Sequence, residues 1–130
     1  MWFLGSPALD PPRVNYQTLR FPEVDSKIYM TARVWGYTGD HEEVRLCTTP
    51  IEFKDTEVGH CIVFYTDEAF YRKVAANRLS IYVPASSVPK NLPVKLGQIE
   101  IEVHELKNSD DVTELKRNYE EHGLVSIAAQ

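Results

Sequence analysis

Apolar and polar residues alternate along most of the chain with the period of two that is typical of β-strands. The clearest segment covers residues 27–35, where every second residue from Ile28 to Val34 is apolar and the others include several β-branched or aromatic residues. The same pattern predicts further strands over residues 43–48, 51–54, 60–66, 69–73, 79–83, 94–106 and 124–127, and a short edge strand near residues 15–21.

Three of these segments carry more detail. Residues 60–66 are almost continuously apolar, which predicts a central strand that is covered on both faces. In residues 94–106 the alternation shifts by one position at Gly97, which predicts a β-bulge inside one long strand. Residues 67–73 fit either one helical turn or a strand, and their β-like composition, followed by an Ala-Ala-Asn turn, favours the strand.

One helix is predicted near the C-terminus, over about residues 109–122. Asn108 can accept a hydrogen bond as its N-cap, Asp110 and Asp111 suit the positive end of the helix dipole, and Gly123 suits its C-terminal cap. Leu115 and Tyr119 lie on one face of this helix and can pack on a sheet.

Together these elements predict a mainly β fold, an antiparallel β-sandwich or open barrel of about seven or eight strands with one C-terminal helix packed on it. Residues 1–22 contain Pro7, Pro11, Pro12 and Pro22, which predicts an extended N-terminal arm. Residues 23–130 then form one β-rich domain, as a chain of 130 residues allows.

Charge and composition exclude some functions. The net charge of -5 comes without a basic cluster, so we expect no nucleic-acid partner. No apolar run reaches the roughly 18 residues of a membrane span, and the apolar start of the chain lacks the basic region of a signal peptide. Because small β-domains commonly work outside the cytosol, we expect an extracytoplasmic protein, either periplasmic, secreted or surface-anchored.

The ionisable residues do not match a known catalytic or metal motif. Cys47 and Cys61 stand in separate strand candidates, and without a disulfide-dense framework we expect two free thiols rather than a bond. Adjacent His60 and Cys61 point to opposite faces of a strand, and Arg45 shares a face with Cys47, so we expect no metal and no cofactor. The alternating carboxylates of Glu100 and Glu102 are typical of a solvated sheet face.

The strongest candidate for function is the turn over residues 35–43, which combines aromatic, glycine and ionisable residues. Trp35, Tyr37, Asp40 and His41 are the predicted binding residues, because aromatic side chains beside polar groups suit a protein or glycan partner. The chain is therefore predicted to be a non-enzymatic binding module. Two alternatives stay open: a small hydrolase that uses carboxylates or a Cys/His pair, and a structural subunit of a larger assembly.

Overall fold

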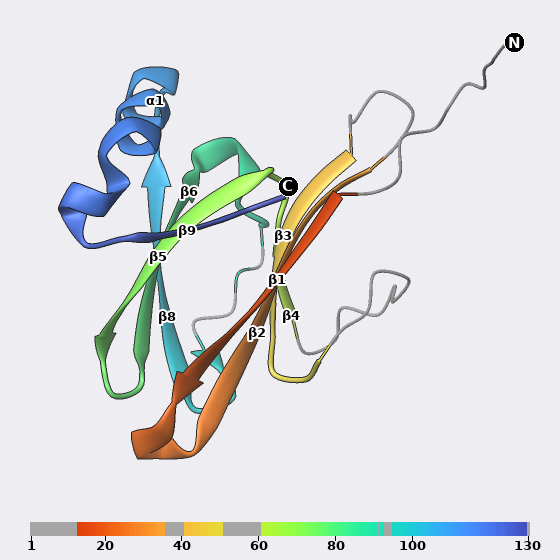
Figure 1. The fold of residues 1–130 in the computed structure, drawn as a ribbon, viewed down its shortest axis with the longest axis vertical. Helices are drawn as coiled ribbons and strands as arrows, with labels where there is room; N and C mark the ends of the chain where they lie inside the picture. The colour runs from red at the N-terminus through yellow and green to blue at the C-terminus, as the bar shows by residue number, and fades with distance from the viewer. Residues whose placement is uncertain (1–12, 36–40, 51–60, 91, 93–94, 130) are drawn as a thin grey trace, which may run out of the picture.

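Two β-sheets lie face to face in the computed structural model, which describes residues 13–35, 41–50, 61–90, 92 and 95–129 (Figure 1). The four-stranded sheet has the order β1 (Arg13–Phe21), β2 (Ser26–Trp35), β3 (His41–Cys47) and β4 (Cys61–Phe64). The five-stranded sheet has the order β7 (Lys95–Leu96), β8 (Ile99–Leu106), β6 (Arg78–Pro84), β5 (Glu68–Ala75) and β9 (Val125–Ala128). The predicted fold class is confirmed.

The core lies between the two sheets, where alternate residues of each strand point inward. Its largest fully buried side chains include Phe21, Ile28, Met30, Leu46, Ile62, Phe64, Leu79, Ile81, Ile99 and Ile127. The alternation in the sequence thus gives each sheet one apolar inner face, and the packing of these two faces holds the domain together.

Side-chain amides connect the two sheets where β1 lies beside β9. Asn15 Nδ2 donates to the carbonyl oxygen of Ala128 at 3.1 Å, and Gln17 Nε2 donates to that of Ser126 at 3.2 Å. Gln17 also accepts a hydrogen bond from the hydroxyl group of Tyr71. Because β9 is an edge strand, these amides satisfy carbonyl groups that would otherwise remain open to pairing with another chain.

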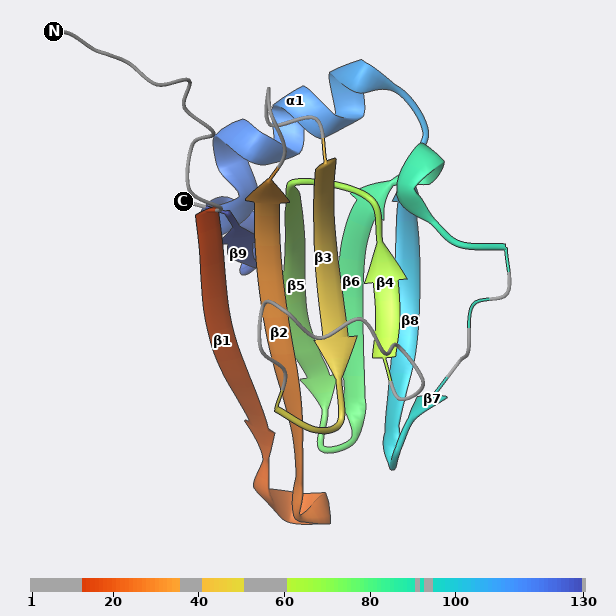
Figure 2. The same ribbon diagram turned by 90° about the vertical axis from the view of Figure 1, so that its right-hand side faces the viewer.

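The predicted helix is confirmed as α1 (Ser109–Asn118), which continues into the 3-10 helix η3 (Tyr119–His122). Asn108 Oδ1 accepts from the backbone N–H of Asp111 at 2.9 Å, as its place at the N-cap predicts. The backbone N–H of Leu124 donates to Tyr119 at 3.1 Å, after Gly123 with a φ of +72°. Figure 2 shows the helices across one end of the sandwich.

Most predicted strands are confirmed, with bounds that differ by a few residues. Residues 68–75 form β5, and residues 75–78 close its hairpin with β6, so the strand was the correct alternative for that segment. From Arg13 on, the segment predicted as an arm is strand β1, which pairs with β2 along its whole length and lies at the sheet edge. The strand predicted over residues 51–54 lies outside the described residues.

Three details of the predicted sheet are wrong. Gly97, with a φ of +60°, is in the turn that joins the antiparallel strands β7 and β8, so the shift in alternation marks a hairpin and not a bulge. β4 lies at the edge of the four-stranded sheet and not at its centre. β6 and β8 run parallel and not antiparallel, so β8 starts at the same end of the sheet as β6.

Candidate functional site

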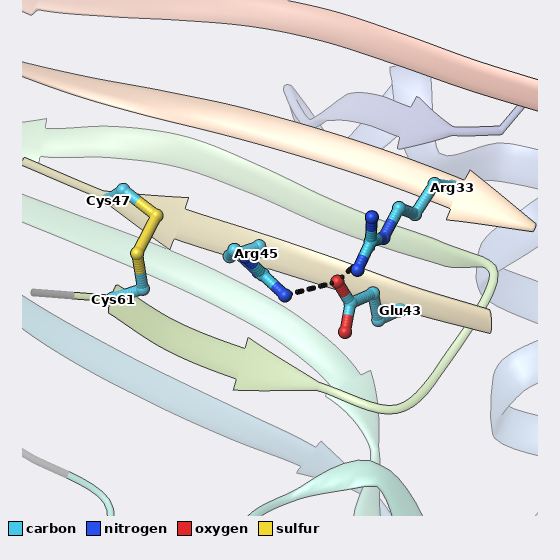
Figure 3. Close-up of a disulfide and its surroundings, with 5 residues drawn as sticks. All are labelled: Arg33, Glu43, Arg45, Cys47 and Cys61. Carbon is cyan, nitrogen blue, oxygen red and sulfur yellow. Dashed lines mark hydrogen bonds and ion pairs between the residues drawn. A yellow bond between two sulfur atoms is a disulfide. The ribbon is translucent and has the colours of Figure 1, made fainter. Parts of the chain in front are cut away.

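The outer face of the four-stranded sheet, which points away from the five-stranded sheet, carries the most specific side-chain contacts of this sheet. Alternate residues of β3 share this face. They are His41, Glu43, Arg45 and Cys47. We call these four residues the row on β3. Each contacts a side chain of a neighbouring strand or of the same row. Of the four, only His41 is exposed, and Figure 3 shows the other three. Because three of these four outward-pointing residues are buried, this face differs from an ordinary solvated sheet surface.

Cys47 and Cys61 form a disulfide between β3 and β4 (Figure 3). The expectation of two free thiols is therefore wrong. The two residues are direct cross-strand partners with a Cα–Cα distance of 4.1 Å, so the register of the sheet places both side chains on the same face. The bond fixes β4, the short edge strand, to the row on β3.

A charged cluster of Arg33, Glu43 and Arg45, here called the ion cluster, lies beside the disulfide (Figure 3). Arg33 Nε and Arg45 Nη2 each donate to Glu43 Oε1 at 2.8 Å. The side chains of Glu43 and Arg45 are only 7% and 6% exposed. Because a buried charge is tolerated only with partners, these short charge-assisted bonds set the direction of the Arg33 side chain.

Arg33 also reaches the ring stack, which we define as Arg33, Trp35 and His41. Its guanidinium carbon lies 4.4 Å from the centre of the Trp35 ring, a cation–π contact. Trp35 and His41 are cross-strand partners, and their rings stack with centres 5.4 Å apart at an angle of 20°. Glu43 therefore positions Arg33, and Arg33 together with His41 positions the indole ring.

The structure brings together two of the four predicted binding residues. Trp35 ends β2 and His41 begins β3, so the strands extend into the segment that was predicted as a turn. Tyr37 and Asp40 lie outside the described residues. The sequence interpretation missed Arg33 and Glu43. Their signal was present, because two strands joined through residues 36–40 place Arg33 directly opposite Glu43.

The strand next to β2 extends this outer face. Val14 of β1 is the cross-strand partner of Arg33, and Tyr16 is the partner of Thr31, so both point the same way as the ring stack. Tyr16 is 55% exposed. Val14, Tyr16, Arg33, Trp35 and His41 form the surface that we call the outer patch.

The alternative of a hydrolase has little support from the described geometry. Cys47 is bonded and offers no thiolate. On the five-stranded sheet, Glu102 Oε1 accepts from Ser80 Oγ at 3.0 Å and lies 3.0 Å from His104 Nε2. This is not a catalytic triad, because the hydroxyl group of Ser80 donates its hydrogen bond to the carboxylate of Glu102 and not to an imidazole base. The same nitrogen of His104 lies near both Ser80 and Glu102, whereas a triad uses one imidazole nitrogen for each partner.

The carboxylates fit general acid catalysis no better. The hydrogen bond from Ser80, followed by that with His104, lowers the pKa of Glu102 from its ordinary value, whereas a general acid needs a raised pKa. Glu100 pairs with Arg78 at 3.6 Å. Within the described part of the chain, no group of three or more His, Cys, Asp or Glu side chains could hold a metal ion; His60 lies outside that part.

No helix among the described residues has the length and apolar character to cross a membrane. Comparison of the chain with protein-family models, curated proteins and solved structures finds no match.

Proposed function

We propose that this chain is a non-enzymatic binding module that engages a partner protein through the outer patch. The observation that carries the proposal is the ring stack, in which Trp35 is held between charged and aromatic neighbours at the end of β2. Tryptophan, arginine and tyrosine dominate the binding energy of protein interfaces. A side chain that is already fixed in the unbound protein loses little entropy on binding, so the order of the stack favours this role.

A protein partner fits the stack better than a glycan. A sugar ring packs flat on an open aromatic face, and the guanidinium of Arg33 already lies over the face of Trp35. The exposed phenol ring of Tyr16 and the imidazole of His41 add hydrogen-bonding groups at the border of the patch. Mixed aromatic and charged surfaces of this kind suit a flat protein contact.

We also propose that the protein works outside the reducing cytosol. The disulfide between Cys47 and Cys61 supports this location, because such bonds form and persist in oxidising compartments. Alkylation of thiols in the denatured protein, taken directly from its source, tests the proposal. Unmodified Cys47 and Cys61 are expected, and quantitative labelling of both would contradict it.

Affinity capture with matched variants tests the binding function. Wild-type protein, Trp35→Ala and Tyr65→Ala are immobilised and exposed to extract and secreted fraction from the native source. Tyr65 is the control because it is 65% exposed and lies beyond the end of β4, outside the outer patch. The expected result is a protein that wild type and Tyr65→Ala retain equally and Trp35→Ala retains about tenfold less.

Two results would contradict the proposal. One is equal capture by all three proteins although their melting curves show that each is folded. The other is a glycan array on which wild type binds and Trp35→Ala does not, because that result would make the ring stack a sugar site.

A further inference from the structure

The free edge of β1 forms one side of the sandwich, at the left of Figure 2. β1 pairs with β2 along its whole length without a shift in register, and no strand among the described residues pairs with its other edge. Neither a proline nor a bulge interrupts the strand between Arg13 and Phe21. Natural proteins usually protect an edge strand with such features, because a regular open edge pairs readily with another chain.

The backbone groups that face this edge belong to alternate residues of β1. In an antiparallel pair, a residue directs both its N–H and its C=O group either toward the partner strand or away from it. Lys73 Nζ donates to the carbonyl oxygen of Arg20 at 2.8 Å, so the backbone groups of Arg20 point away from β2. By the same alternation, the backbone groups of Val14, Tyr16 and Thr18 also point away from β2. These three residues can bond to an added strand.

The neighbouring edge of the other sheet is partly closed. β9 ends the five-stranded sheet beside β1, and the carbonyl oxygens of Ser126 and Ala128 already accept hydrogen bonds from side chains of β1. Among the described residues, no such bond reaches the backbone groups of Val14, Tyr16 or Thr18 at the free edge. β1 is thus the more open of these two edge strands.

The charged residues of β1 favour an acidic partner. The strand contains Arg13 and Arg20 but no aspartate or glutamate, and neither arginine makes an ion pair with the described residues. Lys27, the cross-strand partner of Arg20, adds a third exposed cation at that end. Glu23 and Asp25 lie beyond the end of the strand, in the turn between β1 and β2. A second copy of the chain would bring the same two arginines to the edge, so like charges disfavour a dimer through β1.

We propose that the partner contacts this protein with an extended acidic segment, which adds to the free edge of β1 as a further strand. Its backbone groups bond to those of Val14, Tyr16 and Thr18, as in other complexes formed by strand addition. Carboxylates near its two ends pair with Arg13 and Arg20. This inference rests on the proposed function, because the added strand lies beside Val14 and Tyr16 of the outer patch.

Two capped nonapeptides titrated into ¹⁵N-labelled protein test the place and the charge of binding. The peptide ETVTVTVTE carries a carboxylate at each end, and KTVTVTVTK is the matched peptide with reversed charge. The acidic peptide is expected to shift the amide signals of Val14, Tyr16 and Thr18, and to bind about fivefold more tightly than the lysine peptide. Equal affinity of the two peptides, or no shift at these residues, would overturn the proposal.

Hydrogen exchange measures whether the edge of β1 is open. In the free protein the amides of Val14, Tyr16 and Thr18 should exchange fast, whereas those of Gln17 and Leu19 face β2 and should exchange slowly. The acidic peptide should slow the exchange of the first group. Slow exchange of that group in the free protein would refute the inference, because the edge would then already be covered.

Variants of β1 test the backbone contact and the charge separately. Thr18→Pro removes an N–H group at the free edge, where proline is compatible with a strand, and Thr18→Val is the matched control that keeps this group. Thr18→Pro should weaken binding of the acidic peptide about tenfold, and Thr18→Val should change it less than about twofold. Equal binding by the two variants would refute strand addition. Arg13→Glu combined with Arg20→Glu changes exposed side chains and should make the protein prefer the lysine peptide; an unchanged preference would contradict the acidic partner.

The capture experiment separates this inference from the proposed function. Capture that is lost in Trp35→Ala but kept in Thr18→Pro would refute strand addition and leave the outer patch as the binding surface. Capture that is kept in both variants would refute the proposed function as well. Sedimentation of the protein alone tests a second copy as the occupant: a monomer is expected, and a dimer that Thr18→Pro converts to a monomer would overturn the proposal.

Discussion

Replacement of both Cys47 and Cys61 by alanine tests how much the cross-strand disulfide stabilises the domain. The two residues are 14 positions apart in the sequence, and the bond closes this loop in the unfolded chain as well as in the folded one. Loop-closure entropy for a loop of this length corresponds to about 3 kcal/mol of stability at 25 °C. Because the folded state already holds β3 and β4 together through their backbone ladder, the effect arises mainly in the unfolded state.

The same number predicts a shift in melting temperature. The entropy of unfolding is about 2.1 cal/mol/K per residue near 60 °C, so a chain of 130 residues has about 0.27 kcal/mol/K. A loss of about 3 kcal/mol therefore lowers the melting temperature by about 11 °C. The shift is large enough to measure in a single thermal scan.

Urea denaturation of wild type and of the double alanine variant, each with and without a reductant, measures the effect. Wild type should lose about 3 kcal/mol on reduction and then match the variant, which should not respond to the reductant. The dependence of stability on urea should be steeper without the bond, because the unfolded chain is then less compact. Equal slopes with an unchanged midpoint would refute the entropic argument. A response of the variant to reductant would show that the reagent acts elsewhere.

Three further variants test separate contacts. Glu43→Gln removes the negative charge between the buried Arg45 and the partly buried Arg33 and should cost about 3 kcal/mol in urea denaturation. A loss below about 1 kcal/mol would contradict the ion cluster. Burial, reinforced by Asp67, raises the pKa of Glu42 above its ordinary value of 4.5. The stability that protonated Glu42 contributes is therefore fully present below the pKa that Glu42 has in the unfolded chain. It is lost as the pH rises through the higher pKa that Glu42 has in the folded protein. Glu42→Gln should thus gain in melting temperature over wild type as pH rises from 4.5, and a constant difference would be the contrary result. Gln17→Leu leaves the carbonyl group of Ser126 without its side-chain donor and should cost about 1–2 kcal/mol by the same denaturation assay, whereas an unchanged midpoint would rule out this amide as a tie between the sheets.

Two control variants make comparable substitutions at exposed positions outside these contacts. Glu23→Gln removes an exposed carboxylate and should leave stability within about 0.5 kcal/mol of wild type. Thr18→Val alters the residue beside Gln17 that points to the opposite face of β1, and should have a similarly small effect.

The faces of the strands could be predicted from the sequence, but the direction and order of the strands could not. Alternation states which residues share a face, and it identified the inner residues of β2 from Ile28 to Val34. β8 has one partly exposed face, so residues 99–106 alternate as an antiparallel strand would, and nothing in them indicates that β8 runs parallel to β6. An apolar run does not state how many strands flank it, so the run at Cys61–Phe64 did not reveal an edge strand.

The contacts of the candidate site depend on register, which alternation leaves open by two-residue steps. The bond between Cys47 and Cys61 exists because β3 and β4 align so that the two residues lie opposite each other. Residues 48–60 carry no hairpin signal short enough to fix that alignment from sequence. The connection between β2 and β3 is shorter, so the pairings of Trp35 with His41 and of Arg33 with Glu43 were within reach of prediction.

The row on β3 connects the stability of the sheet to the proposed binding surface. Cys47 ties the strand to β4, Glu43 ties it to β2, and His41 supports Trp35 on the same neighbour. The contacts follow at alternate positions, so a slip of one residue between β2 and β3 would break the ion pair and the ring stack together. The buried charges thus select one register, a role in which ionic groups contribute specificity more than net stability. The outer patch keeps its shape because that register is the only one in which Glu43 meets Arg33 and His41 meets Trp35.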